Sequence, residues 1–391
     1  MADTQAAERK QQLGAKLIEI RRQLHQHPEL SNEEFATTKA IQGWLMEAGI
    51  RIVDYGLKTG VVAEVGGKNS GPVLALRADI DALPIQEETG LPYASQVAGK
   101  MHACGHDYHT ASLIGAALLL KQREETLAGT VRLIFQPSEE KATGAQVVIA
   151  SGALEGVEAI YGIHNKPDLP VGTIGIKPGP IMAAADGFVV EVTGKGSHAA
   201  VPEASIDPIV TAAHMVTALQ SIVSRNVSPL LSAVVSVTRI QSGTAWNVIA
   251  EKAVFDGTIR TFDEQVRQHV LERFKQVAEN VAAAFGATAA VRWIKGPPAV
   301  QNDAALVAAA VAAAQDTKLE IVEPLPSSAG EDFAFYQKQV PGLFFFMGTA
   351  GPQEWHHPAF DIDERALPLT AAYFANLASR YLEPFSETNA Q

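Results

Sequence analysis

The sequence is poor in cysteine and lacks long hydrophobic runs. Its single cysteine, Cys104, excludes an intrachain disulfide framework and is typical of a protein from a reducing compartment. The most apolar stretches, 111–120 and 304–314, are too short and too rich in alanine to span a bilayer. Residues 1–30 contain no apolar segment of the kind that secretion signals carry. We therefore expect a cytoplasmic protein.

Positive charge is also in the minority. The chain has 31 Lys and Arg against 43 Asp and Glu, a net charge of −12, which makes nucleic acids and anionic membrane surfaces unsuitable partners. With 47% hydrophobic and 19% charged residues, the composition is that of a folded globular protein. At 391 residues the chain is too long for a single hydrophobic core, so we expect two domains.

Short apolar runs alternate with helical patterns in the first half of the chain. The runs occupy 61–65, 73–76, 131–135 and 159–163, and the helical patterns occupy 106–122 and 144–152. This alternation predicts an α/β fold: a mixed, mostly parallel sheet with helices on both of its faces.

The pattern changes near residue 184, where strands and helices follow the order β-α-β-β-α-β as far as residue 294. That order is typical of a ferredoxin-like α+β domain. Glycine and proline at 179–180 and 296–298 provide natural hinges on either side. We therefore expect a first domain built from residues 1–183 and 297–391, with a second domain, 184–296, inserted into it.

Three of the apolar runs are followed directly by polar residues that can bind metals or carry protons. Residues 77–81 follow the run 73–76, residues 136–140 follow 131–135, and His164-Asn165 follows 159–163. Sites in open α/β sheets form outside the carboxyl ends of the strands. We therefore expect these side chains to meet at one edge of the sheet.

The stretch 101–110 adds Cys104 and His106 to this set, on a loop that enters an apolar helix. Thiolate and imidazole are good ligands for zinc-like cations. The alternative is a redox-inert core cysteine beside surface histidines. Together with Glu140, His164 and one of the adjacent histidines at 356–357, these residues would suit two metal ions bridged by a carboxylate and a water.

Glu139 stands next to Glu140 and is the natural general base for such a water. An isolated pair of glutamates is more often a solvated loop, but this pair follows an apolar strand. Four motifs now point in one direction. They are His102-Ala103-Cys104-Gly105-His106-Asp107-x-His109, Gln136-Pro137-x-Glu139-Glu140, Arg77-Ala78-Asp79-x-Asp81-Ala82-Leu83-Pro84 and Arg22-x-Leu24-His25-x-x-Pro28-Glu29.

From about residue 15 to 382 the chain closely resembles the amidohydrolase branch of the two-metal aminoacylase/carboxypeptidase metallopeptidases. Hippurate hydrolases, N-acyl-amino-acid amidohydrolases and plant auxin-conjugate hydrolases belong to that branch. The resemblance implies two divalent ions, Mn, Zn, Co or Ni, with Glu139 as general base toward a metal-bound hydroxide. It implies the metal ligands Cys104, His106, Glu140, His164 and, by the spacing of its His-x-Pro motif, His356. His102, His109, Asp79 and Asp81 would support the site.

The inserted domain carries a second set of candidates. The motif from Gly194 to Pro202 contains His198, which in the resembling family stabilises the oxyanion, often in the other subunit's site. Asn247 and Arg260 stand where related enzymes grip the substrate carboxylate. The alternative is a glycine turn with a surface histidine, and two residues of a solvated strand.

These observations predict a two-metal amidohydrolase that acts on N-acyl amino acids or similar small amides. The resemblance further implies a homodimer in which residues 184–296 form a lid and dimerisation domain. A dipeptidase or aminoacyl-conjugate peptidase with the same machinery is the alternative among enzymes. A metal-free binding protein that has kept the fold is the alternative from another class.

Overall fold

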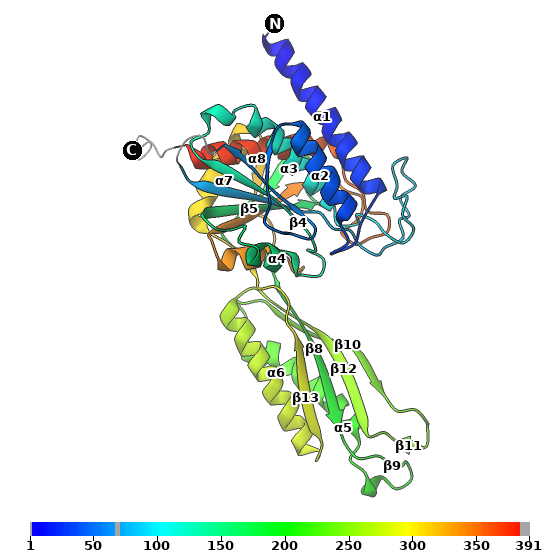
Figure 1. The fold of residues 1–391 in the computed structure, drawn as a ribbon. Coiled ribbons are helices and arrows are strands. Elements are labelled where there is room, and N and C mark those ends of the chain that lie inside the picture. Colours follow the sequence, from blue (N-terminus) through cyan, green and yellow to red (C-terminus); the bar gives the residue numbers. More distant parts are fainter. Residues whose placement is uncertain (1, 67–70, 384–391) are drawn as a thin grey trace. The chain divides into compact units, whose positions relative to one another are not determined.

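The computed structural model describes residues 2–66 and 71–383, which fold into two compact units (Figure 1). The large unit comprises the chain up to Gly179, Gln301–Leu325 and the chain from Phe335 onwards. The small unit comprises Pro180–Val300 and Pro326–Ala334. The expected boundaries assign that second segment to the first domain. It belongs to the small unit because Ser327 exchanges backbone hydrogen bonds with the start of the small unit: its N–H donates to Ile181 O at 2.8 Å.

The large unit is built on an eight-stranded sheet of the order β1-β2-β4-β3-β5-β16-β6-β15. The strands are β1 (Arg51–Val53), β2 (Val61–Gly66), β3 (Val73–Asp79), β4 (Thr130–Gln136), β5 (Val157–Lys166), β6 (Thr173–Gly175), β15 (Glu320–Val322) and β16 (Gly342–Gly348). The central strands β4, β3, β5 and β16 are parallel, and so are β6 and β15, whereas β1–β2, β2–β4 and β16–β6 are antiparallel pairs. The predicted mixed, mostly parallel sheet is confirmed.

Helices pack on this sheet, with α3 and α8 on one side of it and α4 on the other (Figure 1). They are α1 (Ala2–Gln26), α2 (Phe35–Glu47), α3 (His106–Lys121), α4 (Gly144–Ala150), α7 (Ala304–Asp316) and α8 (Leu367–Leu382). Short 3-10 turns lie at Glu124–Thr126 and Glu364–Ala366 in the large unit, at Pro202–Ala204 in the small unit, and at Asp332–Lys338, which begins in the small unit and ends in the large one. Because helices cover the sheet, all seven residues of β16 are buried.

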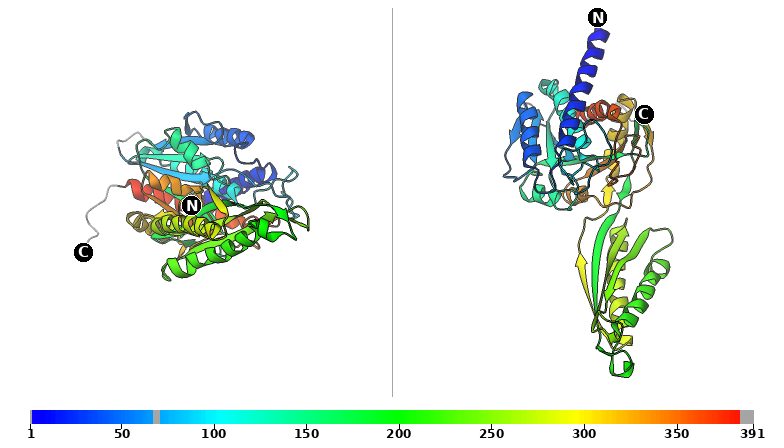
Figure 2. Two further views of the ribbon diagram at one scale, coloured as in Figure 1. Left: turned by 90° about the horizontal axis from the view of Figure 1, so that it is seen from below. Right: turned by 90° about the vertical axis from the view of Figure 1, so that its right-hand side faces the viewer.

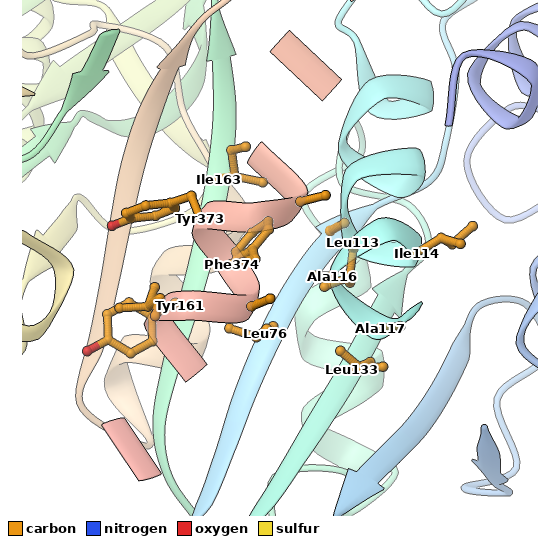
Figure 3. Packing of buried hydrophobic residues seen from close by; sticks show 14 of the residues in the cluster. Leu76, Leu113, Ile114, Ala116, Ala117, Leu133, Tyr161, Ile163, Tyr373 and Phe374 are labelled. Atoms are coloured by element: carbon orange, nitrogen blue, oxygen red, sulfur yellow. The ribbon is translucent and has the colours of Figure 1, made fainter. Parts of the chain in front are cut away.

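Helix α3 is buried around most of its circumference, as its nearly continuous apolar sequence predicts. It packs against α1 and α8, and Figure 3 shows Leu113 and Ala116 beside Phe374 over the strands. A methyl group on Gly115 would lie 2.7 Å from Ala371 Cβ and 2.7 Å from Leu17 Cδ1. The missing side chain lets the three helices approach closely, which fixes the start of α3 at the edge of the sheet.

The small unit contains an antiparallel sheet of the order β10-β12-β8-β13 and two helices. Its elements are β8 (Ala184–Thr193), β9 (Ser197–His198), α5 (Pro208–Asn226), β10 (Ala233–Ser242), β11 (Val248–Ile249), β12 (Lys252–Thr261), α6 (Glu264–Ala284) and β13 (Thr288–Ile294). The two short strands β7 (Gly179–Met182) and β14 (Val300–Asn302) pair with each other where the chain passes between the units.

This β-α-β-β-α-β arrangement is the ferredoxin-like order expected from the sequence. Along β8, buried and half-buried residues alternate, because only one face of the sheet is covered. Helices α5 and α6 lie side by side on that face (Figure 2), and Phe188, Phe255 and Phe274 fill the space beneath them. Across the described parts of both units, no helix is long and apolar enough to cross a membrane.

Candidate metal centre

The polar residues that follow β3, β4 and β5 meet at one edge of the large sheet, together with the start of α3 and the loop after β16. Potential ligand atoms of the described residues lie within 4.8 Å of one another in five groups of three. Three of these groups overlap and contain only predicted ligands and Glu139: Cys104, His106 and His164; Cys104, Glu140 and His356; and His106, Glu139 and Glu140. The chain thus brings together all six residues that the sequence singled out for this site.

The shortest separations place these atoms around a common space. Cys104 Sγ lies 3.5 Å from His164 Nε2, and Glu140 Oε1 lies 3.5 Å from His356 Nε2 and 3.9 Å from His106 Nε2. His106 Nε2 and Glu140 Oε1 are buried and have no hydrogen-bond partner in the described chain. A buried polar atom without a partner is costly, and a divalent cation would satisfy both atoms. The donor set therefore fits metal ions.

Asp81 holds one half of this centre. Its carboxylate accepts hydrogen bonds from the backbone N–H groups of Glu139 and Glu140, each at 3.1 Å, and from Ser31 Oγ at 2.6 Å. It also lies 3.2 Å from His106 Nδ1. With Nδ1 directed at a carboxylate, the other ring nitrogen of His106 presents its lone pair to the centre.

His109 lies one helical turn after His106, and its two ring nitrogens are both engaged. Nε2 accepts the backbone N–H of Asn165 at 2.9 Å, so Nδ1 carries the hydrogen and donates it to Asp79 at 2.6 Å. Arg77 pairs with the same aspartate at 2.7 Å. His109 and Asp79 therefore link the end of β5 to the end of β3 next to the site, as expected of supporting residues.

The electrostatics of the centre are dominated by carboxylates. Burial and the negative charges of Glu140 and Glu139 raise the pKa of the Cys104 thiol well above its ordinary value. Burial opposes the charge on His106, but neighbouring carboxylates, led by Asp79, outweigh it and raise the pKa of His106 to about 10. Cations in this space would take the place of those protons, because metal ligands must be deprotonated.

The loop after β16 presents His356 rather than His357. His356 adopts a left-handed backbone with φ of +66°, and its N–H donates to Ala103 O at 2.8 Å. His357 Nδ1 instead accepts the backbone N–H of Ala359 at 3.0 Å. The geometry therefore agrees with the spacing of the His-x-Pro motif, which selects His356.

The small unit places its three candidates at opposite ends. His198 lies in β9 and pairs with Val248, the residue directly after Asn247. This short strand pair lies beyond the end of the four-stranded sheet at which β12 begins with Lys252. Arg260 lies eight residues further along that strand, a distance of about 27 Å at 3.4 Å per residue. One small unit therefore does not bring Arg260 together with Asn247 or His198.

Arg260 is half-buried and held by its own unit, since its guanidinium donates to Ser328 O and Ile259 O, each at 3.1 Å, and contacts Thr258. Burial lowers the pKa of Arg260 from its ordinary value. His198 is exposed, and its Nδ1 accepts the N–H of Ala200 at 3.1 Å. That bond places the ring hydrogen on Nε2, where it can be donated outward.

The family model described as Peptidase family M20/M25/M40 matches residues 75–380. The chain belongs to this family. The predicted family is confirmed, and so is the predicted class of enzyme, a two-metal amidohydrolase.

Individual members of the M20 family are similar over nearly the whole chain. An N-acetylcysteine deacetylase of Bacillus subtilis is 56% identical over 369 residues, which is 94% of this chain and 97% of the relative. An IAA-amino acid hydrolase of Arabidopsis thaliana is 40% identical over 94% of this chain and 86% of its own. The crystal structure of a Bacillus subtilis protein described as a dinuclear metal-binding peptidase of the M20 family superposes with a TM-score of 0.88 at 52% identity, covering 95% of this chain and 99% of that one.

Two residues at this M20 centre have a part that the sequence did not reveal. Ser31 donates to Asp81 from the turn before α2, and the indole of Trp355 lies 4.4 Å from the ring of His164. Serine and tryptophan are common at positions without function, so neither residue type is a signal by itself. Trp355 stands next to His356, and that adjacency is the one hint the sequence offers.

Proposed function

We propose that this chain removes the acyl group from the amino nitrogen of N-acyl amino acids or similar small amide conjugates. The observation that carries the proposal is the cluster of six acidic, thiol and imidazole groups with its unpaired atoms on His106 and Glu140. Two similar proteins are named for such reactions, an N-acetylcysteine deacetylase and an IAA-amino acid hydrolase. Both names describe cleavage between an acyl group and an amino acid.

In this proposal, two divalent ions are held by Cys104, His106, Glu140, His164 and His356. Glu140 falls in one ligand group with Cys104 and His356 and in another with His106 and Glu139, so its carboxylate would serve both ends of this set. Thiolate and imidazole favour Zn²⁺, and the same set also accepts Mn²⁺, Co²⁺ or Ni²⁺. Such ions lower the pKa of water and polarise the amide carbonyl.

Glu139 acts as the proton carrier. Its backbone N–H is fixed by Asp81, and its carboxylate lies within 4.8 Å of ligand atoms of His106 and Glu140. The carboxylate takes a proton from the attacking water as the new C–O bond forms, and it delivers that proton to the nitrogen as the C–N bond breaks. The products are a free carboxylic acid and a free amino acid.

His198 and Arg260 serve different ends of the substrate. His198 donates from Nε2 to the oxygen on which negative charge develops, and Arg260 binds the free carboxylate through parallel hydrogen bonds. Because these residues lie at opposite ends of one small unit, we assign them to two copies of the chain. His198 and Asn247 of one copy then complete the site that Arg260 of the other copy serves.

This assignment makes the small unit a lid and dimerisation domain of a homodimer. The edge strand β10 supports it, since Val234 and Ile240 on that strand and Trp246 after it expose apolar side chains. An exposed apolar strand edge is a surface suited to pairing with a second copy. The same arrangement agrees with the exposed position of His198.

A substrate screen with matched variants tests the proposal. Metal-supplemented enzyme is offered N-acetyl, N-benzoyl, indole-acetyl and aminoacyl amino acids, and product release is measured. Glu139→Ala should abolish hydrolysis with metal content unchanged, whereas Glu158→Ala, an exposed residue of β5, should retain wild-type activity. Wild-type turnover by Glu139→Ala would refute the role of Glu139. Faster release from free dipeptides than from N-acyl amino acids would favour a dipeptidase.

A further inference from the structure

We propose that Asn165 is a positioning residue that holds the three ligand-bearing segments of Cys104, His164 and His356 in register. The inference rests on the proposed metal site. Asn165 is completely buried at the end of β5, directly after His164. No metal ligand role falls to it, since its side chain is occupied by the neighbouring segments.

The first segment is the turn that carries Cys104. The Asn165 side-chain amide donates from Nδ2 to the backbone oxygen of Cys104 at 2.6 Å. The turn closes onto this amide at Gly105, which has φ of +88°, and a methyl group there would lie 2.3 Å from Nδ2. The close approach therefore requires glycine next to the cysteine.

The second segment is the loop that carries His356. The indole N–H of Trp355 donates to Asn165, with 3.2 Å to the side-chain oxygen and 3.2 Å to the backbone oxygen. Since Trp355 immediately precedes His356, this bond fixes the backbone position of His356, whose conformation is left-handed. The loop is thereby tied to β5 as well as to Ala103.

The third segment is the end of β5 itself. The backbone oxygen of Asn165 lies 2.9 Å from His164 Nδ1, which donates to it and leaves His164 Nε2 facing Cys104. The backbone N–H of Asn165 donates to His109, and through that ring the strand end is linked to Asp79. Each polar group of Asn165 therefore has a partner at the centre.

The chemistry of these contacts requires an amide. Asn165 must donate to a carbonyl and accept from an indole at the same time, which a carboxylate cannot do. Asp81 on the other half of the centre meets only donors and is correctly a carboxylate. The two halves of the centre are thus held by side chains of nearly equal shape but different hydrogen bonding. Asp81 only accepts hydrogen bonds, whereas Asn165 both donates and accepts them.

The isosteric substitution Asn165→Asp tests this assignment, with Asn302→Asp as its control. Asn302 is also a buried asparagine of the large unit, and it bridges Lys177 O and the backbone of Phe344. Metal affinity is measured by competition with a chromophoric chelator, and Cys104 ligation by thiolate-to-cobalt absorption of the Co²⁺-loaded protein.

Asn165→Asp should weaken metal binding about 10–100-fold and diminish the thiolate–cobalt band. Asn302→Asp should lower the melting temperature yet leave metal affinity and spectrum unchanged. If Asn165→Asp does not fold, Trp355→Phe removes the indole N–H while keeping an aromatic ring beside His164, and it should weaken binding roughly 2–10-fold.

Wild-type affinity and an unchanged cobalt spectrum in Asn165→Asp, or in Trp355→Phe where that variant stands in, would overturn the role of Asn165 alone. A wild-type protein that binds no Co²⁺, or binds it without a thiolate band, would overturn the proposed ligand set as well.

Discussion

The candidate residues of the large unit and those of the small unit differ in how they are held. In the large unit, His106, His164 and Glu140 lie at the carboxyl edge of a covered sheet, and fixed partners orient them. In the small unit, His198 sits exposed on a two-residue strand. The contrast teaches that one chain alone assembles the candidate metal centre, whereas the residues we propose for substrate recognition are not held by such partners within their own unit.

The sharpest way to break this comparison is to remove a ligand. His106→Ala should lose at least about 100-fold in metal affinity and show no measurable hydrolysis, because its loss exceeds that of an outer-shell partner. A strong chelator applied to the wild type should reproduce the inactivity. Elemental analysis and a hydrolysis assay check both results. Full metal content in His106→Ala would contradict the assignment.

The next largest effect should come from the small unit. His198→Ala should reduce kcat by about 10²–10³, since one donor to the oxyanion is lost. Metal content and melting temperature should stay at wild-type values because the side chain is exposed and holds no other element. Steady-state kinetics and calorimetry measure these quantities. A loss of metal in this variant would show that the two sets of residues are not independent.

Mixing two inactive variants tests whether sites are shared between copies. Refolding Glu139→Ala together with His198→Ala in equal amounts should restore activity to about a quarter of the wild-type level, because half of random dimers are mixed and each contains one intact site. Each variant alone should keep no more than about 1% of wild-type activity under the same treatment. No restored activity, with mixed dimers demonstrated, would place His198 in the site of its own chain.

A smaller effect is expected at the substrate carboxylate. Arg260→Ala should lower kcat/KM about 10–100-fold, mainly through KM, because a hydrogen bond between charged groups contributes roughly 1.5–3 kcal/mol. Substrates whose carboxylate is capped as an amide should show no difference between the variant and wild type. Equal losses for capped and free substrates would indicate that Arg260 only stabilises the fold through Ser328.

The smallest effect should come from a surface ion pair of the large unit. Arg380 and Asp316 are 2.7 Å apart on the surface, and side chains so exposed contribute about 0–1 kcal/mol. Arg380→Ala should therefore change the free energy of unfolding by no more than that, and metal affinity should not change. Chemical denaturation measures the first quantity. A large drop in metal affinity would mean that the centre is less self-contained than its hydrogen bonds indicate.

The sequence predicted the sheet well, and it singled out residues that the fold brings together, because both depend on local patterns. Apolar runs identify the central strands, and the polar residues directly after them, such as Glu139 and His164, must lie at their carboxyl ends. Helix α1 begins at Ala2, although only its second half has apolar residues at helical spacing, because its first turns contain good helix formers. Helix propensity alone therefore extends α1 at its N-terminal end, where the spacing of apolar residues gives no helical signal.

Features that depend on distant partners could not be predicted. Strands such as β1 and β15 have three residues each, and their pairing is decided by neighbours rather than by their own sequence. The bond between Asn165 and Cys104 crosses 61 residues. The separation of Arg260 from Asn247 likewise follows from the length of β12, since its stretch from Lys252 to Arg260 alone spans about 27 Å.

The position of β16 has a consequence for the order of folding during synthesis. This strand is fully buried between β5 and β6, yet it is translated after the whole run Pro180–Val300 of the small unit. Domains fold as units when their sequence emerges from the ribosome. Nearly the entire sequence of the small unit is therefore available before β16, a central strand of the large sheet, has been translated. His356 follows β16 in the chain, so the candidate metal centre can be completed only late in synthesis.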